Sequence, residues 1–420
     1  MSLEGSVSVQ LGDCSPRGSR QQWRRSSVTA LGGGEAEAET ADFAVGTADG
    51  TVLALDSDGT ERWRTPGEEM AVALAEDDTS LAVGTRGDRG RVRLLDSSGD
   101  ERWAYDTASD LGGPAKDTLF WYPFVVDALA GEDRIYAAAR RYERDSDRPD
   151  GDQRVWRSAV YAFDPDGEVR WRYETDASPI ALSLEDGRLA VAYNRCGGDH
   201  DRGLVVLDAE SGTPVADWDP GTAGERRVGD VSLAGGDLAA ASHGDYRGYL
   251  LGEVDADGGA ERWATDLGVE RAVGDETLYA YPNHVLLAGD AAVFVTGNTF
   301  PEEGREAEGR HPNEHTIAAF SREEGERLWS ASVGGFACEV VSSGERIAVP
   351  CAQHFRDRDA EAHGLRVFDA REGLVREIGA EGVVSSAALS DGRVAFVEEP
   401  VEYHDEGEVR GEYRVRVEQI

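Results

Sequence analysis

A short segment that ends in tryptophan recurs along this chain and constrains its fold more than any other feature. Each copy is an apolar run, usually followed by Asp, then a glycine-containing turn and a polar stretch that closes on Trp. The six clear copies are LALDSDGTERW (53–63), RLLDSSGDERW (93–103), YAFDPDGEVRW (161–171), VVLDAESGTPVADW (205–218), GEVDADGGAERW (252–263) and AAFSREEGERLW (318–329). Recurrence of one supersecondary unit indicates a repeat architecture, so the 420 residues need not divide into several domains.

Two further strands precede the closing hairpins, as pairs of apolar runs around a tight turn that contains Gly or Asp. Examples are SPIALSLEDGRLAVAY (178–193), DVSLAGGDLAAASH (230–243) and VVSSAALSDGRVAFVEE (383–399). Four strands per unit, repeated at intervals of 40 to 68 residues, predict an all-β propeller of four-stranded antiparallel blades.

Two degenerate copies bring the predicted blades to eight and indicate how the ring closes. RVFDAREGLVREI (366–378) lacks the Trp, and 19–25, which contains Trp23, looks like a closing strand alone. The last apolar strand, 413–420, has no closing strand after it. We therefore predict one propeller domain over 1–420, with 1–18 as an N-terminal extension and 19–25 as the closing strand of the last blade. Residues 6–11 (SVSVQL) also alternate and compete for that edge.

The repeat resembles the pyrroloquinoline-quinone (PQQ) type, whose consensus is close to G-x-(V/L)-x-A-L-D-x-x-(T/D)-G-x-x-x-W. GTVLALDSDGTERW (50–63) matches almost letter for letter, and the likeness extends from about Trp23 to Ile420. Proteins with this repeat include quinoprotein dehydrogenases and BamB-like assembly scaffolds of outer membranes, so the resemblance implies the fold and leaves the activity open. WD40 repeats fit less well, because Trp218-Asp219 is the only Trp-Asp pair.

The repeated Gly and Trp residues have structural roles in this reading. The turn before each closing strand requires a positive φ, which accounts for Gly59, Gly99, Gly167 and Gly258. Each Trp is expected to pack a large apolar face between neighbouring blades while its N–H reaches a backbone partner.

The charge is strongly negative, with 82 acidic residues against 43 basic ones and a formal net charge of −39. The only lysine is Lys116, and the acids are spread over every segment. This composition resembles that of a haloarchaeal, salt-in protein, in which concentrated salt screens self-repulsion. It also disfavours nucleic-acid binding. The N-terminus lacks signal-peptide features and no apolar run is long enough to span a membrane, so a cytoplasmic protein is expected. The protein is also expected to be a monomer.

Loop lengths predict one plain face and one elaborate face. Turns between strands one and two, and between strands three and four, are short and share a face. The loops between strands two and three lie on the opposite face and are long: 141–155, 194–203, 298–315, 352–364 and 400–412. Two inter-blade connections on that face, 104–120 and 265–280, are also long. Long loops tend to carry function, so the binding site is expected on this long-loop face.

Two similar inner strands place aromatic residues at the mouth of the central channel. LFWYPFVVDALAGE (119–132) aligns with LYAYPNHVLLAGD (278–290), and both follow a long inter-blade loop. The candidate binding residues are Trp121, Tyr122, Tyr281, Asn283, His284 and Phe336; the alternative is that they fill the channel entrance as core. The arginines of the long-loop face are expected to pair with nearby acids: Arg140, Arg141, Arg144, Arg148, Arg356 and Arg358.

Metal and cofactor motifs are weak. Seven of the eight histidines fall in the loops between second and third strands. Asp199, His200 and Asp201 are the candidate metal ligands, although their spacing matches no strict motif. The Asp-x-Asp-Gly turns lack the rest of a calcium loop, so neither calcium nor PQQ is expected. Cys338 and Cys351 could face each other across a hairpin, but two free thiols are the default in a cytosol.

Two functions remain open from the sequence. The first is a non-enzymatic scaffold that binds a protein or peptide partner through the long-loop face and the channel mouth. The second is an enzyme with a channel-mouth site, either a divergent quinoprotein or a metal-dependent hydrolase. No catalytic motif such as G-x-S-x-G, a P-loop or H-E-x-x-H supports the second.

Overall fold

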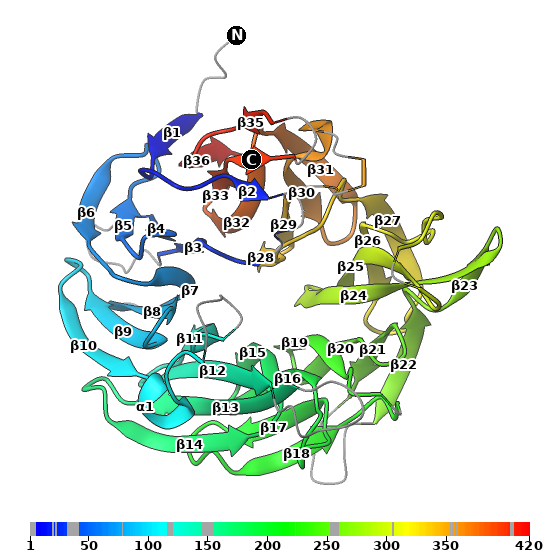
Figure 1. The fold of residues 1–420 in the computed structure, drawn as a ribbon, viewed down its shortest axis with the longest axis horizontal. Helices are drawn as coiled ribbons and strands as arrows, with labels where there is room; N and C mark the ends of the chain where they lie inside the picture. Colours follow the sequence, from blue (N-terminus) through cyan, green and yellow to red (C-terminus); the bar gives the residue numbers. More distant parts are fainter. Residues whose placement is uncertain are drawn as a thin grey trace.

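The computed structural model describes residues 6–18, 21, 23–31, 42–77, 79–115, 121–144, 154–222, 224–252, 260–304, 306–352, 354, 356–357, 360–403 and 407–420. Its sheets are arranged in a ring around a common centre (Figure 1). Within these residues the strands form eight four-stranded antiparallel groups, in agreement with the predicted eight-bladed propeller. Blades two and three join into one sheet through the pair Phe124 and Arg86.

The strands are grouped here by their position in each blade, in blade order one to eight. The inner strands are β3 (Ser27–Ala30), β7 (Met70–Asp77), β11 (Phe124–Ala130), β15 (Ser178–Glu185), β19 (Val228–Ala234), β24 (Glu276–Ala288), β28 (Val341–Ser343) and β32 (Val383–Ser390). The second strands are β4 (Phe43–Gly46), β8 (Ser80–Arg86), β12 (Ile135–Arg144), β16 (Arg188–Arg195), β20 (Asp237–Ser242), β25 (Ala291–Pro301), β29 (Arg346–Cys351) and β33 (Arg393–Glu399).

The two outer positions follow the same order. The third strands are β5 (Val52–Leu55), β9 (Arg91–Asp96), β13 (Arg154–Phe163), β17 (Leu204–Asp208), β21 (Arg247–Leu251), β26 (Thr316–Ser321), β30 (Gly364–Asp369) and β36 (Arg414–Gln419). The outermost strands are β6 (Glu61–Thr65), β10 (Glu101–Asp106), β14 (Val169–Thr175), β18 (Pro214–Trp218), β22 (Glu261–Asp266), β27 (Arg327–Ser332), β31 (Gly373–Gly379) and β1 (Val7–Gln10).

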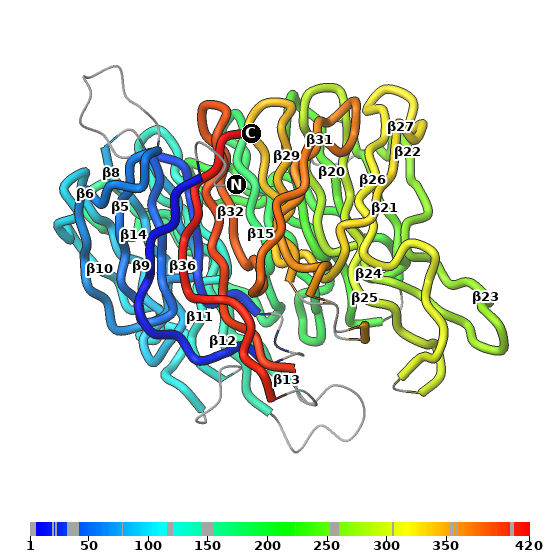
Figure 2. Tube along the Cα trace, turned by 90° about the horizontal axis from the view of Figure 1, so that it is seen from above, coloured from blue at the N-terminus to red at the C-terminus, as the bar shows by residue number. Residues whose placement is uncertain are grey.

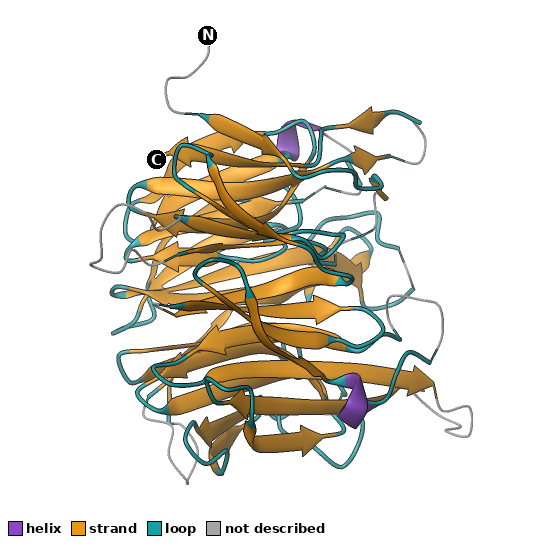
Figure 3. Cartoon of the chain, turned by 90° about the vertical axis from the view of Figure 1, so that its left-hand side faces the viewer, coloured by secondary structure: helices purple, strands orange, loops and turns teal. Residues whose placement is uncertain are grey.

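The remaining elements lie outside the eight four-stranded blades. β2 (Arg17–Gly18), β34 (Val401–Glu402) and β35 (Val409–Arg410) form a small sheet beside blade eight, and β23 (Arg271–Val273) makes a hairpin with the start of β24. Two short helices, α1 (Ala108–Leu111) and η1 (Ala360–Ala362), lie in the connections, whereas strands make up the body of the molecule (Figure 3). No helix in the described part of the chain is long and apolar enough to cross a membrane.

Four of the described repeats contact the next blade through a Trp N–H bond, and turn glycines pack against the Trp of the preceding blade, as the sequence predicts. The indole N–H of Trp103 in blade two donates to the Pro165 carbonyl in the turn of blade three at 3.1 Å. Trp171, Trp263 and Trp329 make the equivalent bond to the following blade. Gly99 has a φ of 85°, and a Cβ there would lie 2.6 Å from the Trp63 ring, so the contact requires glycine. Gly258 lies outside the described residues.

The ring closes through a different N-terminal segment from the one predicted. β1 is the fourth strand of the last blade, with Val7 opposite Val417 and Val9 opposite Val415. The described part of 19–25 is not a strand; instead Trp23 lines the central channel. The assignment of 19–25 as the closing strand was therefore wrong. β3 begins on the channel at Ser27, so the segment before it must lead the chain to the centre, and the outer edge is left to residues further upstream.

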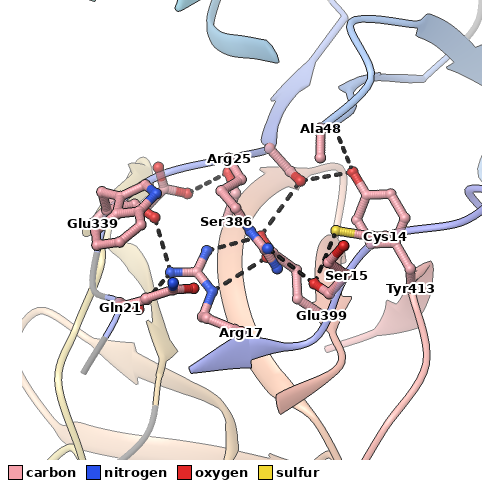
Figure 4. A network of polar contacts seen from close by, with 12 residues as sticks. Cys14, Ser15, Arg17, Gln21, Arg25, Ala48, Glu339, Ser386, Glu399 and Tyr413 are labelled. Carbon is pink, nitrogen blue, oxygen red and sulfur yellow. Dashed lines mark hydrogen bonds and ion pairs between the residues drawn. The ribbon is translucent and has the colours of Figure 1, made fainter. Parts of the chain in front are cut away.

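A buried ion cluster fixes this N-terminal path (Figure 4). Glu399, at the end of β33, accepts bonds from Arg17 at 3.0 Å and from Arg25 at 2.7 Å, and the side chains of Glu399 and Arg17 are fully buried. Arg17 also donates to the carbonyls of Gln21 and Trp23. Burial opposes ionisation of Glu399, but the two guanidinium groups outweigh it and lower its pKa to about 2.

The two faces differ as the loop lengths predict (Figure 2). Two-residue turns join the first and second strands of blades four to eight. On the opposite face, the connections between second and third strands include 196–203, 302–315, 352–363 and 400–413. All four cysteines carry free thiols, and the Cys338–Cys351 region is held by a backbone pair between Ala337 and Cys351 instead.

Candidate functional site

The central channel holds a cavity of about 690 Å³ that all eight inner strands line. Its long-loop end is shaped by one position that recurs in consecutive blades. The second strands SLAVGTR (80–86), RIYAAAR (134–140), RLAVAYN (188–194) and DLAAASH (237–243) align without gaps. Their last residues are Arg86, Arg140, Asn194 and His243, and all four line the cavity. The propeller thus presents four polar side chains side by side at the mouth, from blades two to five.

Several polar atoms of this group are buried without a hydrogen-bond partner. These atoms are Nε of Arg86, Oδ1 of Asn194 and both ring nitrogens of His243. An unsatisfied buried donor or acceptor costs about 1–3 kcal/mol, so a fold rarely retains several together unless a ligand or water satisfies them. Burial lowers the pKa of His243 to about 3, which keeps its ring neutral.

Arg86 and Arg140 also line a second, smaller pocket of about 230 Å³ beside the cavity, which we call the arginine pocket. Its described lining contains arginines and aromatics but no Asp or Glu: Arg86, Arg140, Arg141, Arg154, Arg195, Arg226, Tyr122, Phe124, Tyr142, Trp156, Ser178 and Asn194. The Arg86 guanidinium carbon lies 3.6 Å from the centre of the Phe124 ring, and that of Arg140 lies 5.5 Å from the same centre. Arg226 stacks on Tyr281 at 4.9 Å.

Three of these cations have no carboxylate partner among the described residues: Arg86, Arg140 and Arg226. Arg140 donates to neutral acceptors, the Ser178 hydroxyl and the Pro179 carbonyl. Burial, reinforced by the neighbouring guanidinium of Arg140, lowers the pKa of Arg86 to about 9. Burial and Arg195 lower the pKa of Arg140 to about 10. Both groups stay charged at neutral pH, and their charges repel each other. We call Arg86, Arg140 and Arg226 the arginine cluster.

The carboxylates that line the cavity are engaged elsewhere. Asp127 accepts the Leu182 N–H of the next blade at 2.8 Å, and burial raises its pKa to about 6. Asp230 accepts the Val285 N–H at 2.9 Å, and Glu339 accepts the Ala387 N–H at 2.7 Å. Each carboxylate therefore caps the free edge of the neighbouring inner strand, which is a structural role.

The structure brings together most of the predicted channel-mouth residues. Tyr281, Asn283, His284 and Phe336 line the central cavity, and Tyr122 lines the arginine pocket. Trp121 differs: it is buried, its ring centre lies 5.0 Å from that of Tyr142, and it lines neither space. His284 is held by the Ala337 carbonyl at 3.1 Å and lies 3.6 Å from Asp230. That these residues bind a ligand stays a prediction.

The expected pairing of arginines with local acids holds only in part. Arg141 pairs with Glu143, whereas Arg140 has no carboxylate partner among the described residues. Arg148 and Arg358 lie outside the described residues. The sequence interpretation missed Arg86, Asn194 and His243 as site residues. The sequence does contain a signal for them, because an alignment of the second strands places Arg86, Asn194 and His243 at the same position.

The predicted metal ligands do not meet at one point. His200 is bonded through Nε2 to the Arg202 carbonyl at 2.9 Å, while the backbone N–H groups of Asp199 and His200 bond to Asp176. In the described part of the chain, the residues whose possible metal-ligating atoms come within 4.8 Å of one another are Glu314, His315 and His354.

Comparison with known proteins supports the fold. A family model described as outer membrane protein assembly factor BamB matches residues 10–116 and 200–395. The crystal structure of BamB from Moraxella catarrhalis is similar to 99% of this chain and 96% of its own, with a TM-score of 0.56 and 16% identity. A chain in the crystal structure of a mitotic checkpoint complex matches 83% of this chain and 89% of its own, with a TM-score of 0.51 and 11% identity. No curated protein sequence matches the chain.

Proposed function

The chain belongs to the family described as outer membrane protein assembly factor BamB, and from this premise we propose that it is a non-enzymatic propeller that docks an acidic segment of a protein partner at its channel mouth. A family named after an assembly factor supports a scaffold role. The long loops around the mouth offer surface for a protein rather than for a small molecule alone.

The observation that carries this proposal is the arginine cluster. A chain with a net charge of −39 has acids available for almost any arginine, yet Arg86, Arg140 and Arg226 have no carboxylate partner among the described residues. A carboxylate brought from outside would neutralise the cluster and could accept two parallel N–H bonds from one guanidinium. Because these groups are partly shielded from water, salt weakens such a contact less than it weakens a surface pair.

The arginine cluster lines both the central cavity of about 690 Å³ and the smaller arginine pocket, and only the smaller pocket has the size of a single side chain. Ligand sites for small molecules usually span about 300–1,000 Å³. The arginine pocket, at about 230 Å³, fits one Asp or Glu side chain or a C-terminal carboxylate. Phe124, which lines this pocket and stacks against Arg86, would pack on the aliphatic part of the entering residue.

Binding of a fluorescein-labelled hexa-aspartate peptide, followed by anisotropy, tests the proposal. The titration is run in molar salt, where the Debye length is about 3 Å and the net charge of the protein no longer repels the probe. Loss of one charge-assisted bond costs about 1.5–3 kcal/mol, so we expect Arg86→Gln and Arg140→Gln to weaken binding by about 10- to 100-fold.

The matched control is Arg371→Gln, which removes the same charge from an exposed turn on the opposite face. It should leave the affinity unchanged, and a hexa-asparagine peptide should bind far more weakly than hexa-aspartate. Equal affinity for the two peptides, or an equal loss in Arg371→Gln, would refute a specific role for the cluster.

A further inference from the structure

Two long loops of neighbouring blades bring together three metal-type ligands. Glu314 and His315 lie in the loop of blade six, and His354 lies in the loop of blade seven, which is next to it in the ring (Figure 1). One ligand atom from each residue lies within 4.8 Å of the other two. His315 and His354 are buried, with 2% and 6% of their surface exposed. The site is distinct from the arginine cluster, which lies in blades two to five.

The lone pairs of two of these residues are unused. His315 donates from Nε2 to the Asn298 amide oxygen at 2.8 Å, which leaves Nδ1 unprotonated; Nδ1 is buried and has no hydrogen-bond partner. Oε2 of Glu314 is also buried without a hydrogen-bond partner. An ion that accepts both lone pairs would remove two unfavourable buried groups.

The groups around His315 resemble those around a metal-bound histidine. A metal-bound imidazole usually donates its second N–H to an oxygen, and Asn298 fills this role for His315. His315 also has a φ of 48°, an uncommon value for a residue other than glycine, and such backbone strain clusters at functional sites.

Arg310 and Asp357 lie next to the three ligands, and a bound metal ion would change their contacts. The Arg310 Nε lies 3.9 Å from Oε2 of Glu314, beyond hydrogen-bond distance, and its guanidinium is bonded to Asp357. The Asp357 N–H contacts Nδ1 of His354 at 3.3 Å, a long bond that coordination through Nε2 would give up.

We propose that Glu314, His315 and His354 bind a divalent first-row transition ion and thereby clamp the long loops of blades six and seven together. Two imidazoles and one carboxylate suit Zn²⁺ and its neighbours, whereas Ca²⁺ and Mg²⁺ prefer ligand sets made of oxygen. Three protein ligands leave a further position for water.

Zn²⁺ titration of tag-free, chelator-stripped protein tests the site by calorimetry and by thermal melting. Wild type should bind one Zn²⁺ per chain and melt at a higher temperature with Zn²⁺ than without it. Glu314→Gln and His354→Ala should bind at least about 100-fold more weakly, and Asn298→Ala about 10- to 100-fold more weakly because it only orients His315. All three should keep the fold, which circular dichroism without metal checks.

His200→Ala is the matched control, because it removes a loop histidine of blade four and should leave Zn²⁺ binding unchanged. Wild type alone gives a second readout: bound Co²⁺ should show the visible absorption of an imidazole-ligated site. Absence of stoichiometric Zn²⁺ binding, preference for Ca²⁺, unchanged affinity in Glu314→Gln, or a loss in His200→Ala overturns the proposal.

Discussion

Glu399→Gln removes the buried negative charge that Arg17 and Arg25 share and should destabilise the ring closure strongly. The side chains of Glu399 and Arg17 are fully buried, and that of Arg25 is 9% exposed. A fall in the carboxyl pKa from 4.5 to about 2 corresponds to about 3 kcal/mol of stabilisation of the ionised form. Breaking a buried ion pair typically costs about 3–5 kcal/mol, so both routes predict a loss of at least about 3 kcal/mol.

Urea denaturation followed by tryptophan fluorescence measures this loss, with Glu61→Gln as control. Glu61 pairs with Arg64 on the surface, and such a pair is worth about 0–1 kcal/mol. The folded-state pKa of Glu399 lies below its unfolded value, so its stabilisation is complete above about pH 4.5 and is lost as the pH falls towards 2. The difference in free energy of unfolding between wild type and Glu399→Gln should therefore decrease as the pH falls from about 4.5 towards 2. A loss below about 1 kcal/mol at pH 7, or a difference independent of pH, would refute the reasoning.

Two further substitutions test the packing of the ring. Gly99 and Gly187 both have a positive φ, but a Cβ at Gly99 would meet Trp63 at 2.6 Å, whereas nothing lies within 4 Å of one at Gly187. Gly99→Ala should therefore destabilise the fold by more than about 1 kcal/mol and Gly187→Ala by less, which urea denaturation compares. Ser8→Cys with Arg416→Cys should form a disulfide on mild oxidation, because these residues are opposite each other in β1 and β36. Ser8→Cys with Arg414→Cys, out of register, should not, and a gel without reductant distinguishes the two; equal cross-linking would contradict the register.

The repeated parts of the fold were predictable because each is a local pattern. The Trp, the turn glycine and the flanking apolar runs lie within a dozen residues, and Trp103 and Trp171 make the expected contacts. The closing strand of the last blade was not predictable in this way, because Val7–Gln10 and the segment with Trp23 both match the pattern of a fourth strand. Only the route of the chain to the channel at Ser27 decides between them.

The site residues were harder to predict because they depend on contacts between blades. With 82 acids in the chain, composition gives every arginine a plausible partner, so it cannot show that Arg86 and Arg140 lack one. Likewise, His315 and His354 meet only because blades six and seven are neighbours, and no short spacing links them. The sequence did indicate that loop lengths differ between the two faces and that Tyr281 and His284 lie at the central cavity.

A crystal structure with the hexa-aspartate peptide bound would test most directly whether the channel mouth receives acidic segments. We expect a peptide carboxylate within hydrogen-bond distance of Arg86 or Arg140, with the peptide chain running over the long-loop face. A peptide seated only on the outer surface of the blades, or an arginine cluster occupied by carboxylates of this same chain, would contradict the proposal.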